Sequence, residues 1–577
     1  MLHAQPKAAL ALFVLLGACV PPHDDSPADD PDVTVPSVTE LPLAICDDPV
    51  GAPGRFDDGN PGSGVDFLHV IIPPVFDNTP EDDDPFNGAF GGGVVAADLD
   101  GDGAADLFFA QEDGANQLYW GQGNGTFEPA SDATAGTIGL ADSRTFYVNT
   151  ADYDGDGRLD LLVAGFESLH LFRNQGDRSF LEVATTVGLA PVPGYPGGLA
   201  WGDYDQDGDL DLFVGSYGLV ETGPDANTNG PDVVASSLYR NDGALFSDQT
   251  SNLPIVSDEE GACLQAAFRD LDDDGDLDLL QVNDFGPWRG MTNFWENGGA
   301  TEGAWSWVDR HPDSGVGQLR YPMGSLFRDL DGDQHPDLWF SNIGATRALQ
   351  SVGPWQWVDV RVAWATEVVE TSSDISWSVV DIDLYGDGRP SVYINFGPHI
   401  GAEPPPDWGE NYVPNQPDRF LVNDADLGSQ PDFRLAPEVF PHEQTGNARG
   451  TAIADLDNNG VPDLVTSNLD SAPSILLGRC TTSRRLVVSL RDPLSSNRFG
   501  IGAKVTVEAG ALMQTQEISA GGRGSFSGSE PQLFFGLGEA DRVDRLQVRW
   551  PDGIVESFEG LCGHCQVTIT RATDSTD

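Results

Sequence analysis

A short acidic motif recurs along the chain with constant internal spacing, and it constrains the fold more than any other feature. The first copy spans residues 98–107, DLDGDGAADL, with acids at its positions 1, 3, 5 and 9. Later copies keep this spacing, and position 6 is usually glycine. We interpret each intact copy as a metal-binding loop. The predicted ligands are Asp98, Asp100, Asp102 and Asp106; Asp152, Asp154, Asp156 and Asp160; Asp203, Asp205, Asp207 and Asp211; Asp270, Asp272, Asp274 and Asp278; Asp329, Asp331, Asp333 and Asp337; and Asp455, Asp457, Asn459 and Asp463.

The spacing suits calcium, a hard cation that prefers roughly six to eight oxygen ligands. Alternate carboxylates and a backbone carbonyl at position 7 supply such oxygens, and glycine at position 6 permits the sharp turn. An EF-hand loop begins in the same way, but its last acid stands later and helices flank it. Here apolar runs such as residues 161–163 flank the loops and predict short strands. The sequence therefore predicts about six calcium ions, each held between two strands.

The alternative is that these Asp-Gly clusters only form hairpin turns, as such residues often do. A turn needs one aspartate, however, whereas four crowded carboxylates repel one another unless a cation lies among them. Six copies with the same offsets therefore favour metal binding.

Two copies depart from the pattern. The loop that begins at Asp383 has Tyr385 at position 3 and Ser391 at position 9, so we predict that it binds calcium weakly or not at all. The loop that begins at Asp329 keeps its acids but has Gln334 at position 6, which predicts a strained turn.

The spacing between copies predicts the architecture. Successive loops begin 54, 51, 67, 59, 54 and 72 residues apart, a period that with strand-rich content is typical of a propeller. A second signature follows the loops, for example residues 116–120 and then Phe127, which look like the third and fourth strands of a unit. We predict an all-β fold: a seven-bladed propeller of four-stranded sheets, which leaves few exposed edges, and a small C-terminal β domain.

The charge balance limits the partners. The chain carries 92 acidic against 29 basic residues, a net charge of −63, so nucleic acid is an unsuitable partner. The predicted loops contain only part of the acids. The remainder predicts a solvated acidic surface, which favours solubility and a monomer.

Residues 1–18 have the features of an export signal. Lys7 precedes an apolar run over residues 8–16, which is too short to span a bilayer. Residues 16–19, Leu-Gly-Ala-Cys, resemble a bacterial lipobox, in which the cysteine, here Cys19, is lipidated. The alternative is an ordinary secretory signal with an accidental cysteine.

Lipidation at Cys19 implies that an N-terminal lipid anchor is the only contact with a membrane. Val20 follows Cys19, which in Gram-negative lipoproteins favours the outer membrane or cell surface over the inner membrane. Residues 19–43 are rich in Pro, Asp and Ser and predict a disordered tether.

The remaining cysteines are Cys46, Cys263, Cys480, Cys562 and Cys565. Export permits one or two disulfides among them, with one thiol left over, and the sequence leaves the pairing open. Residues 562–565, Cys-Gly-His-Cys, have the spacing of a thiol oxidoreductase site, but such a site opens a helix, whereas residues 566–570 predict a strand. We therefore expect a structural disulfide there rather than a redox centre.

The motifs resemble known families. The acidic repeats are similar to the FG-GAP/VCBS repeats of integrin alpha-type propellers, and residues 67–70 with 91–98 resemble the opening of the cartilage acidic protein-like family. Residues 497–505, 535–538 and 548–553 are similar to the ASPIC/UnbV domain that ends such proteins.

The resemblance covers about residues 64–572. It implies a seven-bladed propeller over residues 44–480, an ASPIC/UnbV β domain over 481–572 and a short tail, with binding roles more often than chemistry. Lys504, the one lysine after residue 19, stands in a matched motif, so a structural role is expected rather than a catalytic one.

A ligand-binding face is expected opposite the acidic loops. The next loop of each unit emerges there, and it is long over residues 217–236 and 397–418. Long loops in compact domains are often functional. The alternative is that the aromatic residues in these loops only pack the loops against the domain. The predicted ligand-binding residues are Tyr217, Trp288, Trp408 and Tyr412.

No catalytic motif stands out, and residues 524–528 have Phe526 where a nucleophile elbow would need its nucleophile. We predict a calcium-binding, lipid-anchored cell-envelope protein that recognises glycan or protein ligands, as in adhesion. The alternatives are a calcium-dependent carbohydrate-active enzyme, such as a lyase, at the propeller centre, and a passive envelope scaffold. A pocket with convergent Arg and His beside an open calcium position would favour the enzyme.

Overall fold

The computed structural model describes residues 36–43, 54–71 and 90–572, except for 142, 219–233, 255–260, 287–289, 302–303, 367–373, 399–415, 427 and 522–523. Almost all regular structure in these ranges is β-strand, which confirms the predicted all-β class. The described helical segments are short: α1 (Asp132–Ile138), η1 (Thr250–Asn252), η2 (His311–Asp313) and η5 (Pro437–Val439). None of the described helices has the length and apolar character that crossing a membrane requires.

Six described sheets contain four antiparallel strands that follow one another along the chain, and a seventh combines three such strands with one from the N-terminal region. Each of the seven carries one acidic loop between two successive strands, and one of them also pairs in parallel with residues 528–529. The first three sheets are β3 (Val94–Ala97), β4 (Asp106–Phe109), β5 (Gln117–Gly121) and β6 (Phe127–Pro129); β7 (Thr145–Ala151), β8 (Asp160–Gly165), β9 (Ser168–Gly176) and β10 (Ser179–Glu182); and β11 (Tyr195–Gly202), β12 (Asp211–Gly218), β13 (Ser237–Asn241) and β14 (Phe246–Asp248).

The next three sheets repeat this order. They are β15 (Ala262–Arg269), β16 (Asp278–Asp284), β17 (Asn293–Thr301) and β18 (Ala304–Asp309); β19 (Ser325–Arg328), β20 (Asp337–Phe340), β21 (Arg347–Gly353) and β22 (Gln356–Asp359); and β23 (Ser376–Ile382), β24 (Ser391–Phe396), β25 (Arg419–Asn423) and β26 (Phe433–Leu435).

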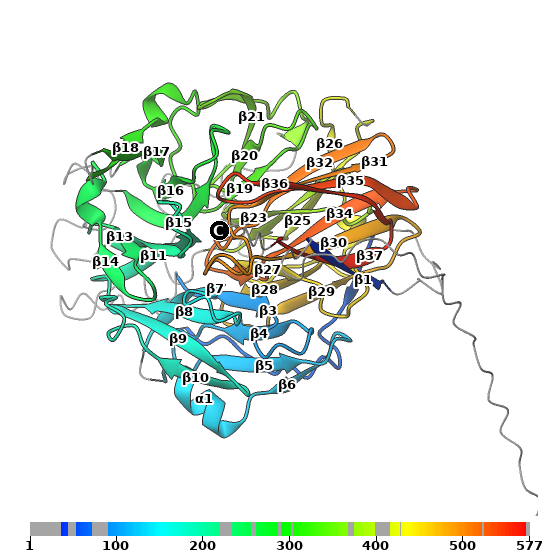
Figure 1. Cartoon of the computed structure of the whole chain (residues 1–577). Helices are drawn as coiled ribbons and strands as arrows, with labels where there is room; N and C mark the ends of the chain where they lie inside the picture. Colours follow the sequence, from blue (N-terminus) through cyan, green and yellow to red (C-terminus); the bar gives the residue numbers. More distant parts are fainter. Residues whose placement is uncertain are drawn as a thin grey trace, which may run out of the picture.

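The last sheet closes the ring with a strand from the other end of the chain. It contains β27 (Ala448–Ala454), β28 (Asp463–Asn468), β29 (Ser474–Gly478) and the N-terminal β2 (Phe56–Asp58), which pairs antiparallel with β29. The first strand of β27–β29 lies beside both β23 and β3, and β7 lies between β3 and β11. Figure 1 shows the sheets around a ring in chain order, so the fold is a propeller.

The inner strands pack tightly because they carry small residues. Strands β11 and β15 are buried along their whole length. A Cβ atom on Gly198 would stand 2.2 Å from the backbone nitrogen of Ala266, so only glycine allows β11 to approach β15 this closely.

A second domain, which we call the cap, contains two further four-stranded sheets. One has the order β1 (Ser37–Pro42), β37 (Cys565–Thr570), β30 (Arg484–Arg491) and β34 (Gln532–Gly538). The other has the order β32 (Leu512–Glu517), β31 (Lys504–Ala509), β35 (Arg542–Arg549) and β36 (Val555–Cys562). Their buried side chains belong to one hydrophobic core, for example Val488, Val507 and Leu546, as the alternating strands predict.

The N-terminal strand β1 corrects the predicted tether. Residues 37–42 pair antiparallel with β37 along its full length, from Ser37 opposite Thr570 to Pro42 opposite Cys565. The predicted tether over residues 19–43 is therefore too long, because its last part completes the cap. Cys19 lies outside the described residues.

The cysteines behave as structural residues. Cys562 and Cys565 form a disulfide where β36 turns into β37, as predicted. Cys480 is also disulfide-bonded, and Cys263 is a buried free thiol. Cys46 lies outside the described residues.

The cap sits on the face of the propeller that carries the acidic loops. The Arg498 guanidinium donates to the Gly155 carbonyl at 2.9 Å, and the Ser495 hydroxyl donates to the Gly208 carbonyl at 2.8 Å. On the other side of the ring, the Gly538 amide donates to the Gly386 carbonyl at 2.8 Å. Acidic loops of different units therefore contact one rigid domain.

The cap also sends a segment into the propeller axis. Residues 524–530, which we call the hub segment, include β33 (Gly528–Ser529), which pairs in parallel with β3. The Phe526 carbonyl accepts from Val148 of β7, and the Gly524 carbonyl accepts from Gln265 of β15. The Ser525 amide donates to the Ser378 hydroxyl of β23 at 2.8 Å. The hub segment therefore joins inner strands from several sides of the ring.

Phe526 anchors the hub segment. Its ring stacks on Tyr147 at 4.4 Å and lies 5.8 Å from the Trp377 ring, and its side chain is 2% exposed. The sequence Gly-Ser-Phe-Ser-Gly at 524–528 is thus part of the domain contact.

Removing this anchor should destabilise the whole molecule. We expect Phe526→Ala to lower the free energy of unfolding by about 3 kcal/mol, because it leaves a cavity between two inner strands. Chemical denaturation measures the change. Ile554→Ala, at a cap residue that is 53% exposed, is the control and should change stability by about 0.5 kcal/mol or less. Equal effects of the two substitutions would contradict the anchoring role.

Candidate metal centres

The acid at position 9 of each intact loop is also the first residue of the second strand, for example Asp106 in β4 and Asp160 in β8. Asp160 is 1% exposed, and both of its carboxylate oxygens accept backbone N–H groups. One bond comes from Tyr153 at 3.1 Å and the other from Asn174, in the third strand, at 2.7 Å. Position 9 therefore ties the loop to the sheet. The same pair of bonds occurs at Asp106, Asp211, Asp278, Asp337 and Asp463.

The acid at position 1 folds the loop around itself. Asp152 accepts the amide of Asp156 at 3.0 Å and that of Gly157 at 2.8 Å. Gly157 has φ +87°, a left-handed conformation that glycine adopts without strain, and its position 6 equivalents share it. The loop thus directs its acids toward one point.

Carboxylate oxygens converge in the intact loops as predicted. In four loops the acids at positions 1, 3 and 9 place oxygens within 4.8 Å of one another. In the loop from Asp329 the converging acids are instead those at positions 1, 3 and 5. The groups are Asp98, Asp100 and Asp106; Asp152, Asp154 and Asp160; Asp203, Asp205 and Asp211; Asp270, Asp272 and Asp278; and Asp329, Asp331 and Asp333.

Several of these oxygens are buried without a partner. The Oδ1 atoms of Asp154, Asp205 and Asp457, all at position 3, and of Asp270, at position 1, accept no hydrogen bond within the described part of the chain. A buried carboxylate oxygen in this state costs free energy unless a cation contacts it.

Burial also disfavours the charged form of these acids when no cation lies among them. Burial raises the pKa of Asp106 to about 8, and the neighbouring Asp100 and Asp98 add to the rise. Burial raises the pKa of Asp203 to about 7 in the same way, with repulsion from Asp207. The buried oxygens, their convergence and the all-oxygen donor set therefore fit a hard divalent cation such as calcium.

The loop from Asp383 holds an arginine instead. Arg485 of β30 donates to the Asp383 carbonyl at 2.6 Å and to the Leu384 carbonyl at 2.7 Å. Arg485 is 3% exposed, and the negative charges of Asp383 and Asp387 oppose the fall in its pKa that burial causes. This loop has Tyr385 and Ser391 in place of two acids, so it is poorly equipped to bind a metal. The Arg485 guanidinium supplies the positive charge instead.

Lys504 plays a related part at the loop from Asp270. Its ammonium group lies 2.9 Å from Asp270 Oδ2 and 2.6 Å from Asp273 Oδ1. It therefore joins the cap to this loop, in keeping with the expected structural role. The other carboxylate oxygen of Asp270, Oδ1, is buried and accepts no hydrogen bond from the described residues.

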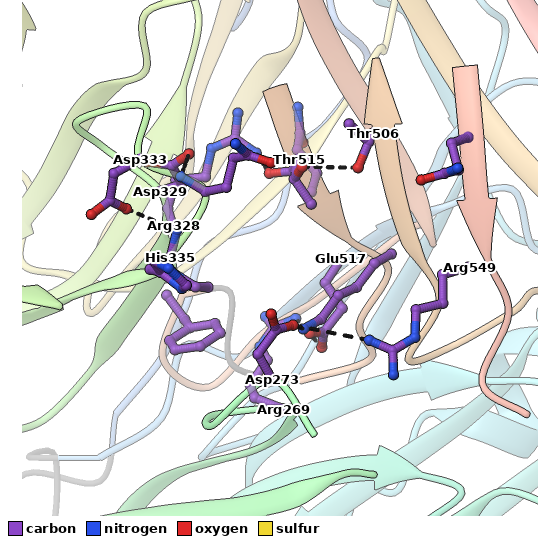
Figure 2. Close-up of a pocket in the computed structure, with 16 residues that line it drawn as sticks. Arg269, Asp273, Arg328, Asp329, Asp333, His335, Thr506, Thr515, Glu517 and Arg549 are labelled. Carbon is purple, nitrogen blue, oxygen red and sulfur yellow. Dashed lines mark hydrogen bonds and ion pairs between the residues drawn. The ribbon is translucent and has the colours of Figure 1, made fainter. Parts of the chain in front are cut away.

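The loop from Asp329 is the most open of the set. Gln334 has φ +73°, which confirms the strained turn expected for a residue other than glycine at position 6. Asp329, Asp333 and His335 line a cavity of about 320 Å³ under the cap. Figure 2 shows this cavity, with Arg269, Arg328, Glu517 and Arg549 among its lining residues.

The structure describes one of the four predicted ligand-binding residues, Tyr217, and places it in the core. Tyr217 is 2% exposed, packs against Phe90, and donates its hydroxyl to Asp284 at 3.0 Å. It is therefore a core residue, and its assignment to an exposed face is wrong. The other predicted residues, Trp288, Trp408 and Tyr412, lie outside the described residues.

Comparisons with known proteins agree with the two-part architecture. Residues 98–163 and 152–214 match the FG-GAP-like repeat, and residues 493–576 match the ASPIC and UnbV family. The chain combines FG-GAP-like repeats with an ASPIC and UnbV domain. The ASPIC and UnbV match therefore covers the cap from residue 493 onward, and the matched repeats contain the first three acidic loops.

The curated relatives are distant. Cartilage acidic protein 1 of Mus musculus is 25% identical over 523 residues, which cover 84% of this chain and 73% of the relative. The Homo sapiens protein of that name is 23% identical over 493 residues, covering 80% of this chain and 60% of the relative. Part of each relative thus lies outside the match.

Two solved structures show weaker likeness. An Agrocybe aegerita lectin, described as recognising non-reducing terminal N-acetylglucosamine, is 14% identical, covers 67% of this chain and 94% of its own, and has a TM-score of 0.38. The V. cholerae biofilm matrix protein Bap1 is 11% identical, covers 89% of this chain and 65% of its own, and has a TM-score of 0.26. Neither likeness bears on function at these TM-scores.

Neutralising one intact loop should remove one metal ion. We expect Asp154→Asn to lower the calcium content by about one ion per chain, because it removes a buried oxygen charge at position 3. Metal analysis after dialysis measures this. Asp387→Asn in the loop that holds Arg485 is the matched control and should leave the count unchanged. An unchanged count for Asp154→Asn would show that this loop holds no ion.

Removing the arginine should cost stability in a way that calcium does not restore. We expect Arg485→Gln to lower the free energy of unfolding by about 3 kcal/mol, because it leaves the buried Asp383 carboxylate without its cation. The adjacent Arg484→Gln, which breaks only an exposed pair with Asp541, should cost about 0.5 kcal/mol or less. Full recovery of Arg485→Gln by added calcium would show that this loop is a metal site after all.

Proposed function

We propose that this chain is an exported, calcium-stabilised binding protein that recognises glycan or protein ligands. The observation that carries the proposal is the position of the acidic loops between the FG-GAP-like repeats and the ASPIC and UnbV domain. In this position a bound cation neutralises buried carboxylates and holds two domains together. The bound ion then stabilises the scaffold that recognises the ligand.

The propeller axis supports a binding role over chemistry at the centre. The lyase alternative requires substrate access to that axis, where Phe526 packs between Tyr147 and Trp377. Ser525 adds a hydrogen bond from its hydroxyl to the Trp377 carbonyl at 2.9 Å. These contacts occupy the end of the axis that faces the cap.

A carbohydrate-active enzyme remains the second candidate because of the cavity beside the loop from Asp329. Arginines and His335 converge there, which is the arrangement expected of such an enzyme. The cavity lies off the axis, between the repeats and the cap, so any chemistry would belong to this place and not to the propeller centre.

The expected location is the cell exterior. The relatives' name, cartilage acidic protein, and the predicted export signal both support this. The lipid anchor at Cys19 and an outer-membrane or surface position are part of the proposal, as is the absence of nucleic-acid binding in a monomer with net charge −63.

Ligand screening tests the function. We expect the chain from residue 20, probed on glycan and purified-protein arrays, to retain at least one ligand in calcium and to lose it in chelator, because the scaffold depends on the ions. Incubation with polysaccharides should release no unsaturated or reducing-end product. Polysaccharide cleavage would favour the enzyme, and the absence of any calcium-dependent ligand would favour the passive scaffold.

A further inference from the structure

The cavity beside the loop from Asp329 is bounded by both domains. Its volume is about 320 Å³, within the size range of small-ligand sites. Strands β15 and β19 form the propeller wall, and strands β31, β32 and β35 form the cap wall. Figure 2 shows side chains from both walls pointing toward one another across the space.

The walls are unusual for this chain because their charges balance. Arg269, Arg328, Lys504 and Arg549 line the cavity together with four acids, whereas the sequence as a whole has 29 basic and 92 acidic residues. A wall drawn at random from this composition would be strongly acidic. The balanced charges therefore favour a ligand that has no net charge of its own.

Ion pairs fix these groups before any ligand arrives. Arg269 contacts Glu517 at 3.3 Å, and the two side chains are 3% and 8% exposed. Arg328 is backed by Asp381 at 3.5 Å. Polar groups held in this way lose little conformational freedom when they bind a ligand.

Glu517 also has an unused acceptor. Its Oε2 atom is buried and accepts no hydrogen bond from any residue that the structure describes, while its Oε1 atom faces Arg269. Glu517 lines the cavity, and arginines line its other walls. A ligand that satisfies both must donate and accept hydrogen bonds within a few ångströms.

Hydroxyl groups meet this requirement, since each donates one hydrogen bond and accepts others. The ring of Phe327 also lines the cavity and offers an apolar surface. A pyranose presents both hydroxyl edges and apolar C–H faces. A calcium ion held by the loop would add a second partner for hydroxyl oxygens, because Asp329 and Asp333 stand in the same wall.

We propose that this cavity binds a neutral saccharide unit, with Glu517 accepting from its hydroxyl groups and arginines donating to them. The proposal rests on the proposed binding function and names the site and the ligand class. It places recognition at the junction of the two domains and not on the opposite face of the propeller.

The test uses the chain from residue 20 in calcium, on an array of neutral and uronate-containing oligosaccharides, followed by titration of the neutral oligosaccharide with the strongest signal. We expect Glu517→Gln to weaken binding at least tenfold. Gln547→Trp, which fills the cavity from a half-buried residue of β35, should abolish binding. Arg545→Trp is the matched control on the same strand outside the cavity lining, and it should bind as the unchanged chain does.

Melting temperature and calcium content show whether each variant is folded, and Gln547→Trp decides the question if Glu517→Gln is unstable. Neutral-glycan binding that survives Gln547→Trp overturns this site but leaves the proposed function standing. Binding of uronate-containing oligosaccharides alone, or of proteins alone, overturns the ligand class. The absence of any ligand in calcium overturns both proposals.

Discussion

Repulsion among buried carboxylates is the constraint on which this structure depends. Each intact loop brings several acids to one point beside an inner strand, and burial there penalises their charged form. Positive charge among these carboxylates relieves the repulsion and allows them to stay charged. The cap supplies this charge through Arg485 at the loop from Asp383 and part of it through Lys504 at the loop from Asp270, and the six intact loops fit calcium.

The two domains are joined at the acidic loops and at the propeller axis. The cap does not hang from the propeller on a linker; it contacts acidic loops of several units and inserts the hub segment into the axis. Metal sites, domain contact and axis are therefore parts of one arrangement. The cavity proposed to bind a saccharide lies within the same junction, so the loops that stabilise the scaffold also shape the site.

Local features of the sequence predicted much of this. Fixed offsets of acids located the first two strands of every unit, because position 9 must begin a strand for its carboxylate to bridge two backbone amides, as Asp160 does. The Cys562–Cys565 disulfide followed from the strand after it. The structural role of Lys504 was expected from its place in the motif that resembles the ASPIC/UnbV domain, whereas its contacts with Asp270 and Asp273 were not predicted.

Long-range contacts were beyond such reasoning. Nothing local marks Phe526 as the centre of a propeller axis, or residues 37–42 as a strand of a domain that begins more than four hundred residues later. Tyr217 looked like an exposed loop aromatic, yet its strand continues inward and buries the ring beside Phe90. That Arg485 takes the place of a metal ion at one loop could not be predicted either, because this requires knowing that the cap lies on the face that carries the acidic loops.

Thermal unfolding of the chain from residue 20, in calcium and in chelator, with metal content counted on the same sample, tests the central claim most directly. The account predicts a large rise in melting temperature with calcium and about six bound ions per chain. No shift and no bound metal would mean that the acidic repeats are turns alone, and would contradict the account.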